Sequence, residues 1–161
     1  MAEVLTQEYL EAELRSSMED LRSELLAADA ALFVQKPGVD KWSVRDVVCH
    51  LVDTELLIFQ YRLNRMLTDV ETPHFPDIDH ARWELEHIYA GQDWAKKLQE
   101  LESERSKTIA MVHGATQALF EREAHHEVHG TITMGFIADY CARHTRVHLN
   151  QIRRTLTEVG N

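Results

Sequence analysis

Residues 143–154 read RHTRVHLNQIRR, and this stretch combines the spacing of an amphipathic helix with two histidines. His144 and His148 are four residues apart, so on a helix their side chains project from one face about one turn apart. The apolar stripe of the same helix is formed by Ile137, Cys141, Val147, Ile152 and Leu156. The pattern therefore predicts a helix that turns two imidazoles toward, or close to, the side that it buries.

Two earlier segments carry the same kind of helical spacing. In the first, apolar residues recur at intervals of three and four from Leu14 to Leu32, which predicts a long helix that ends before the KPG sequence. The second begins at the KWSVRD sequence, where Ser43 is the expected N-cap and Asp46 occupies the capping-box position. This second helix is expected to continue to about residue 68.

The later part of the chain predicts two more long helices. The third is expected from about residue 92 to Gly114, and the last, capped by Thr131 or Thr133, runs to about residue 158. A short helix is expected around 80–89, and the ATQALFERE sequence is expected to add another short helical piece. HHEVHGT is expected to be a loop, and no segment alternates in the way that predicts a strand.

The segment TDVETPHFPDIDH, residues 68–80, is the main break in the helical pattern because it contains two prolines and several turn-forming residues. A connection this long can cross a bundle between its second and third helices, where a tight turn would join antiparallel neighbours. The predicted fold class is therefore all-α: a four-helix bundle that forms a single domain over residues 1–161.

Composition and charge exclude several classes of protein. The formal net charge of −10 argues against nucleic-acid binding, which needs a basic surface. There is no apolar run long enough to span a membrane and no signal-peptide pattern, so a cytoplasmic location is expected. Cys49 and Cys141 are too few for a disulfide scaffold, and both are expected to be reduced and buried.

A third histidine shares the helical setting of the first two. His50 lies beside the apolar stripe of the second helix, and neighbouring helices of a bundle are close enough for it to meet His144 and His148. Three imidazoles with an open position are typical of a catalytic zinc site. Asp53, one turn after His50, is expected either to orient that imidazole or to pair with a surface cation.

Two other interpretations of the histidines remain open from spacing alone. The three imidazoles would also be explained as residues at the edge of the core, hydrogen-bonded to carboxylates or water. His125 and His129 have the same spacing as His144 and His148, although they fall in the expected loop. His74, His80, His87 and the histidines of that loop are expected on the surface, where the latter would also be able to cover a pocket mouth.

Two separated motifs resemble those of the DinB-like superfamily of four-helix metalloproteins. KWSVRDVVCHLVDTE (41–55) is similar to the family's second-helix start, and GTITMGFIADYCARHTRVHLNQIRR (130–154) to its closing helix. ESERSKTI (102–109), which contains Arg105, resembles its third-helix segment. The resemblance spans nearly the full chain.

The resemblance implies an up-down-down-up bundle in which His50, His144 and His148 bind a divalent metal ion, usually zinc or nickel, at a pocket at one end of the bundle. Characterised members of the family include thiol S-transferases that use low-molecular-weight thiols such as bacillithiol, and a mycothiol-dependent maleylpyruvate isomerase. The implied partners are a small-molecule substrate and a low-molecular-weight thiol as co-substrate.

Other residues near the predicted triad have two interpretations each. Tyr140 and Gln151 flank the triad on the last helix and would either line a pocket or pack. Arg105 lies on the apolar stripe of the third helix, where it needs a carboxylate such as Glu55 or Asp53 unless it extends to solvent. Cys141 precedes His144 by one turn and is expected to act as a small apolar residue; ligation of the metal is the alternative.

The predicted function is that of a metal-dependent enzyme, a thiol S-transferase or a hydrolase. A metal ion activates a thiol or a water in either case, and no side chain is an evident covalent nucleophile. The alternatives are a non-catalytic metal- or ligand-binding or stress-related protein, and a structural helical dimer. A homodimer is expected in each case.

Overall fold

The computed structural model describes residues 5–161 and consists of four long helical columns. The first is α1 (Gln7–Ala27), and the third and fourth are α5 (Trp94–His113) and α7 (Met134–Val159). The second column is continuous but changes its winding: α2 (Val44–Thr54) leads into a π-helical segment, η2 (Glu55–Gln60), and then into α3 (Tyr61–Thr68). The predicted all-α four-helix bundle is confirmed.

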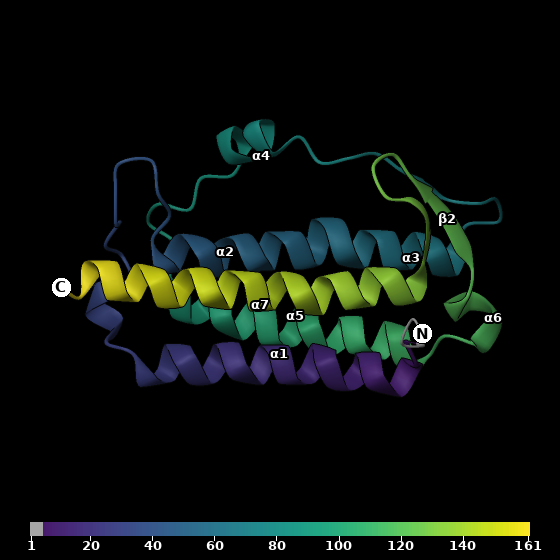
Figure 1. Ribbon diagram of the computed structural model, residues 1–161, viewed down its shortest axis with the longest axis horizontal. Coiled ribbons are helices and arrows are strands. Elements are labelled where there is room, and N and C mark those ends of the chain that lie inside the picture. Colours follow the sequence, from purple (N-terminus) through teal and green to yellow (C-terminus); the bar gives the residue numbers. More distant parts are fainter. Residues whose placement is uncertain (1–4) are drawn as a thin grey trace.

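The order and direction of the columns give the up-down-down-up topology (Figure 1). α1 and α7 run in one direction, and the α2–α3 column and α5 run in the other. α1 packs against α5 and α7, and α2 packs against the same two helices. The second and third columns are thus parallel neighbours, which a tight turn cannot join.

The crossover between these parallel columns, residues 69–93, returns along the length of the bundle (Figure 1). It contains the two-residue strand β1 (His74–Phe75) and the short helix α4 (His80–Glu86). The prediction of a long crossover with a short helix is therefore confirmed.

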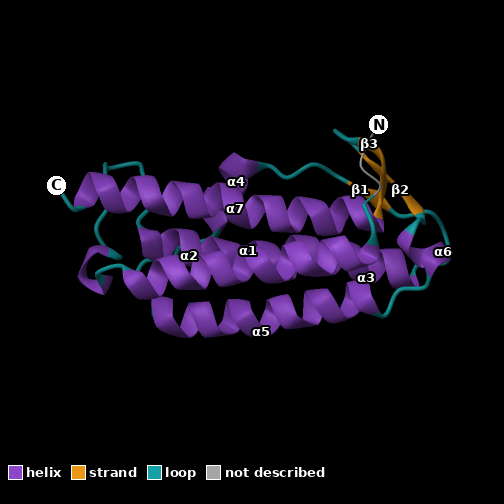
Figure 2. Ribbon diagram, turned by 60° about the horizontal axis from the view of Figure 1, so that its bottom comes forward, coloured by secondary structure: helices purple, strands orange, loops and turns teal. Residues whose placement is uncertain are grey.

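The prediction that the chain contains no strand was wrong. A small three-stranded sheet lies at one end of the bundle (Figure 2), where β1 pairs in parallel with β2 (Glu123–His126), and β2 pairs in antiparallel with β3 (Gly130–Thr133). The predicted loop HHEVHGT is thus the hairpin between β2 and β3, and α6 (Gln117–Phe120) precedes it. Strands of two to four residues are too short to show a period-2 pattern in the sequence.

Local signals set most helix ends correctly. Ser43 and Asp46 form the predicted capping box, and Thr133 is the N-cap of α7. α1, however, ends earlier than predicted: Asp29 caps a separate 3₁₀ turn, η1 (Ala30–Leu32), so the apolar periodicity continues past the end of the helix.

A buried polar layer divides the apolar core into two clusters. One cluster, which includes Leu14, Phe59 and Ile109, lies toward the sheet, and the other includes Met18, Leu51 and Leu101. In each column, buried polar residues lie between the members of the two clusters; they are Ser17, Glu55, Arg105, Thr108 and Thr145.

Arg105 is the centre of this polar layer. Its Nε and Nη2 atoms donate to the two carboxylate oxygens of Glu55 at 2.9 and 2.8 Å. Nη1 donates to Leu14 O and Ser17 Oγ, and Nη2 also donates to Thr145 Oγ1. Of the two carboxylates that the sequence offered as its partner, Glu55 is the one that binds, and the ion pair is excluded from water.

The predicted stripe of α7 needs one correction. Val147 is 61% exposed, whereas Ile137, Cys141 and Ile152 are buried. The polar side of α7 contributes ion pairs to the packing of the bundle: Arg146 pairs with Glu13 and Asp20 on α1. No helix within residues 5–161 is long and apolar enough to cross a bilayer.

Candidate metal centre

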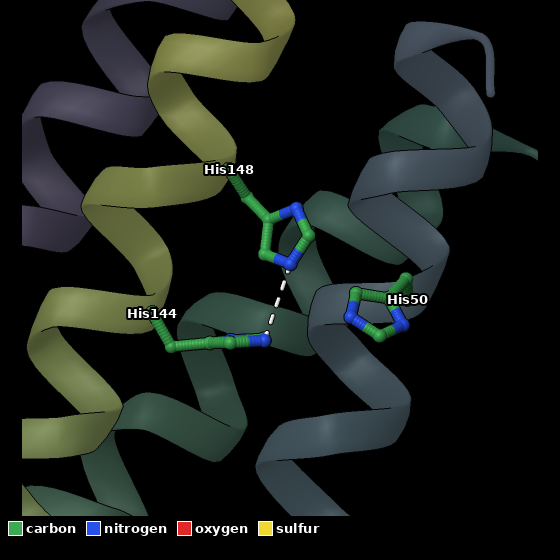
Figure 3. Close-up of side chains that lie close together, drawn as sticks. All are labelled: His50, His144 and His148. Carbon is green, nitrogen blue, oxygen red and sulfur yellow. Dashed lines mark hydrogen bonds between the residues drawn. The ribbon is translucent and has the colours of Figure 1, made fainter. Parts of the chain in front are cut away.

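The three predicted ligands lie together because α2 and α7 are adjacent columns. His50 extends from α2, and His144 and His148 extend from consecutive turns of α7; Figure 3 shows the three rings turned toward one another. One ring nitrogen from each residue lies within 4.8 Å of the other two. Residues almost a hundred positions apart thus form a single cluster of nitrogen donors.

The hydrogen bonds of the cluster indicate which ring nitrogens are available to a metal ion. His148 Nδ1 lies 2.7 Å from Gln151 Oε1, which can only accept, so Nδ1 carries the proton and the lone pair is on Nε2. That Nε2 accepts a hydrogen bond from His144 Nε2 at 3.1 Å (Figure 3), a contact that a bound metal ion would replace. Zinc–nitrogen bonds of about 2.0–2.1 Å hold tetrahedral nitrogens roughly 3.3 Å apart, so this pair already has the separation that a metal requires.

His50 is the least satisfied member of the cluster. It is 8% exposed, its Nδ1 is buried without a partner, and neither ring nitrogen has a hydrogen bond to a described residue. Leaving a buried polar group unpaired costs about 1–3 kcal/mol. The alternative in which carboxylates satisfy the three histidines therefore has no support in the described part of the chain, whereas a shared cation would use these donors.

Burial keeps all three imidazoles neutral. Desolvation, followed by the neighbouring histidines, lowers the pKa of His50 from 6.5 to about 2. Desolvation, followed by His148 and Arg105, lowers the pKa of His144 to about 3, and desolvation also lowers the pKa of His148. Neutral imidazoles are the form that binds a metal ion, so the site is ready for a cation at neutral pH.

The histidines form part of the wall of a pocket of about 610 Å³. Residues along most of α7, from Phe136 to Glu158, line this pocket, together with α2, the crossover and the β2–β3 hairpin. The pocket therefore extends along the side of the bundle, and the expectation of a pocket at one end was wrong. Because the crossover returns beside the bundle, it supplies a wall that four bare helices would lack.

Asp53 does not orient His50. It lines a separate small pocket of about 200 Å³ together with Cys49, Tyr89 and Lys97. Desolvation raises the pKa of Asp53, and a hydrogen bond with Tyr89 opposes this shift. The one-turn spacing placed Asp53 on the helix correctly but could not specify which neighbouring element its side chain faces.

The other predicted pocket residues divide into two groups. Tyr140 and Gln151 line the pocket, as one of their two interpretations required. Arg105 and Cys141 are fully buried in the core, and Cys141 donates from Sγ to Glu55 Oε2 at 3.4 Å. Desolvation raises the pKa of Cys141 well above its usual value, so this thiol is unsuited to act as a ligand.

Several pocket residues were not identified from the sequence. Trp42 lies next to His50, with ring centroids 4.7 Å apart, and Trp83 of α4 lies 6.3 Å from the same imidazole. His80 also lines the pocket. His126 and His129 line it as well, in line with the alternative in which histidines of the loop cover a pocket mouth, and His126 is 2% exposed where the surface was the first expectation. Periodicity gave no signal for Trp83, His80 or the hairpin histidines because the crossover and hairpin are irregular.

The lowered pKa values predict a specific pH dependence for the metal-free protein. Its folded state keeps His50 neutral, whereas the unfolded chain binds a proton below pH 6.5. Stability from this residue is present above pH 6.5 and is lost as the pH falls, by up to about 2 kcal/mol at pH 5. Urea unfolding at pH 7 and pH 5 should therefore show a smaller loss for His50→Gln than for the wild type. Equal losses would contradict the buried, neutral state of this imidazole.

A four-helix bundle whose side pocket contains three convergent histidines is typical of one class of protein, the helical metalloproteins with an open metal site. The family comparison agrees: residues 11–152 match the model of the DinB superfamily. The chain therefore belongs to the DinB superfamily.

Individual relatives are similar to this chain at low sequence identity. The chain is 25% identical over 116 residues to the Oceanobacillus iheyensis protein OB0413, whose name marks it as an inferred metal-dependent hydrolase. This match covers 72% of the chain and 65% of that relative, so the chain spans slightly less than two thirds of the relative's length.

Two solved structures extend the comparison. YfiT from Bacillus subtilis, described as a probable metal-dependent hydrolase with an unusual four-helix bundle topology, has a TM-score of 0.81 at 20% identity; the match covers 99% of this chain and 91% of YfiT. A mycothiol-dependent maleylpyruvate isomerase has a TM-score of 0.73 at 14% identity, with 91% of this chain and 60% of the isomerase covered. At these identities, the likeness establishes the fold.

Proposed function

We propose that this protein is a metal-dependent enzyme that acts on small molecules, and that His50, His144 and His148 hold its divalent cation. The observation that carries the proposal is the convergence of three neutral, largely buried imidazoles in the wall of a 610 Å³ pocket. Relatives named as metal-dependent hydrolases support the metal requirement. Zinc and nickel are the proposed metals, since imidazole nitrogens suit both.

A divalent cation at this position would supply Lewis acidity and lower the pKa of a water or thiol that it binds. The chain itself contributes orientation and exclusion of water. Gln151 holds the His148 ring in the tautomer that leaves Nε2 free, and Trp42 covers both His50 and His148. Such partners of metal ligands typically change metal affinity by about 10–100-fold when removed.

Within this class, we favour thiol S-transfer over hydrolysis. No cysteine is among the described residues that line the large pocket, so the nucleophilic sulfur would come from a low-molecular-weight thiol. The structural likeness to a mycothiol-dependent isomerase favours a thiol-using reaction, whereas the likeness to proteins described as hydrolases favours activation of water. The pocket volume is that of a site for small molecules.

A thiol panel tests the preferred reaction. The metal-loaded protein is mixed with each of several low-molecular-weight cellular thiols and monochlorobimane, in which sulfur displaces chloride and the thiol proton passes to the buffer. With at least one thiol, the metal-loaded protein is expected to react faster than the His144→Ala variant, because that variant lacks one of the three proposed metal ligands. If no thiol gives a rate above the variant, S-transfer is excluded, and a panel of esters and amides tests hydrolysis.

The second candidate function is that of a non-catalytic metal- or ligand-binding or stress-related protein. It predicts the same metal content and pocket but no turnover with either panel. A cytoplasmic location and a homodimer complete the proposal, and sedimentation tests the second of these directly.

A further inference from the structure

Arg62 is a buried arginine whose charge the protein compensates only in part. It lies on α3, is 9% exposed and lines the large pocket. Its guanidinium lies 5.7 Å from the centre of the Phe75 ring, and Nη2 donates to Pro76 O at 3.3 Å. Within the described chain it has no other hydrogen bond and no ion pair, although a guanidinium carries five N–H donors.

Arg105 provides an internal comparison because it is also buried. It uses its donors on both oxygens of Glu55, a backbone carbonyl and two hydroxyl groups. Arg62 instead donates a hydrogen bond to a single carbonyl oxygen, and desolvation lowers its pKa. A buried charge without a partner is unfavourable, so the unused donors of Arg62 indicate a binding requirement that the folded chain does not meet by itself.

His126 adds a neutral donor beside this cation. It is the register partner of Phe75, whose ring lies under the Arg62 guanidinium, and it lines the same pocket. Its Nδ1 accepts from the backbone N–H groups of Val128 and His129 at 3.1 and 3.4 Å, so Nε2 carries the proton. No described residue accepts from Nε2. Burial, followed by Arg62, lowers the pKa of His126, which keeps the ring neutral.

We propose that Arg62 and His126 form an anion subsite of the large pocket, which binds a carboxylate group of the substrate. A planar guanidinium matches the two oxygens of a carboxylate, and the imidazole N–H supplies a further donor. Asp77 also lines the pocket, and its charge stabilises Arg62, but it makes no ion pair with Arg62 or any other described residue and leaves the donors available.

The position of the subsite limits the size of the substrate. Arg62 follows His50 by twelve residues on one continuous column, which corresponds to roughly 10–18 Å when the reach of the side chain is included. Phe59, Ile137 and Tyr140 line the pocket along with both sites. The substrate class is thus an elongated small molecule with a carboxylate at one end and its reacting group near the histidines. This class rests on the proposed function, whereas the anion subsite does not require the metal.

Benzoate and its neutral analogue benzamide test the subsite by calorimetric titration, with metal-loaded protein and with protein stripped by a chelator. Benzoate is expected to bind more tightly than benzamide to both forms. Arg62→Gln should weaken benzoate binding by about tenfold or more, because hydrogen bonds to a charged group are lost, and should leave benzamide within about twofold. Arg62→Lys keeps the positive charge but lacks the planar set of N–H donors of a guanidinium. Its affinity for benzoate should therefore lie between those of the wild type and Arg62→Gln.

Arg65→Gln is the matched control. Arg65 also lies against Phe75 and also donates to a crossover carbonyl, that of His74, but it does not line the pocket. The Arg65→Gln variant should bind benzoate with the affinity of the wild type. The subsite is refuted if benzoate does not bind, if Arg62→Gln leaves benzoate unaffected, or if it weakens both ligands equally. Arg62-dependent binding to the stripped protein would support the subsite even if the thiol and ester panels show no turnover.

Discussion

His50→Ala is expected to purify without stoichiometric metal, whereas the untagged wild type retains about one divalent ion per chain. His50 is the only donor of the cluster that comes from α2, and removing it leaves two imidazoles one turn apart on α7. Loss of a direct ligand should lower metal affinity more than loss of an outer partner, that is, by more than about 100-fold. Elemental analysis and titration against a competing chelator measure both quantities.

His125→Ala is the control for this experiment. His125 is an exposed histidine of β2 that stacks on His74 and lies outside the large pocket, so the variant should retain the metal. The same variant tests the second histidine pair of the sequence, His125 and His129. The proposed centre would be wrong if His50→Ala kept its metal or if His125→Ala lost it.

Arg105→Met is expected to lower the free energy of unfolding by about 3–5 kcal/mol, because it leaves the carboxylate of Glu55 buried without its partner. That carboxylate is 2% exposed and accepts from Arg105 through both oxygens. Urea unfolding of the metal-free protein measures the loss. The double variant Glu55→Gln with Arg105→Met should lose less than the sum of the single variants, since the uncompensated charge is then absent.

The matched control is an exposed ion pair between the same kinds of side chain. Arg22 and Glu102 are also 2.8 Å apart, but Arg22 is 55% exposed, so Arg22→Met should change the free energy of unfolding by less than about 1 kcal/mol. If Arg105→Met cost no more than this control, the polar layer would not be a stabilising element of the core.

The outline of the fold was predictable because it depends on local signals. Apolar spacing located the four columns, and the Ser43 capping box located the start of α2. Two details failed for related reasons: the periodicity after Ala27 continues into a 3₁₀ turn, and the strands are too short to produce a pattern. Val147 has apolar character but faces solvent, which periodicity alone does not reveal.

The placement of the candidate site residues was predictable where it depended on one helix and was not where it depended on contacts between distant segments. The joint projection of His144 and His148 follows from their spacing on α7. Asp53 was expected at His50, but its side chain lies in a separate pocket with Tyr89, a residue of the crossover. His126 was expected on the surface and is buried, because the sheet that covers it joins segments about fifty residues apart.

Local signals in the sequence specify the four helical columns, the Ser43 cap and the two imidazoles of α7, since each of these depends on residues within a few turns of one another. The tertiary structure decided the rest: that His50 meets this pair, that Glu55 binds Arg105, and that the crossover encloses a pocket with Arg62 in its wall. The physical reason is that burial and pairing depend on which surfaces of distant segments come into contact. Periodicity along the chain describes one surface at a time and does not specify its neighbour.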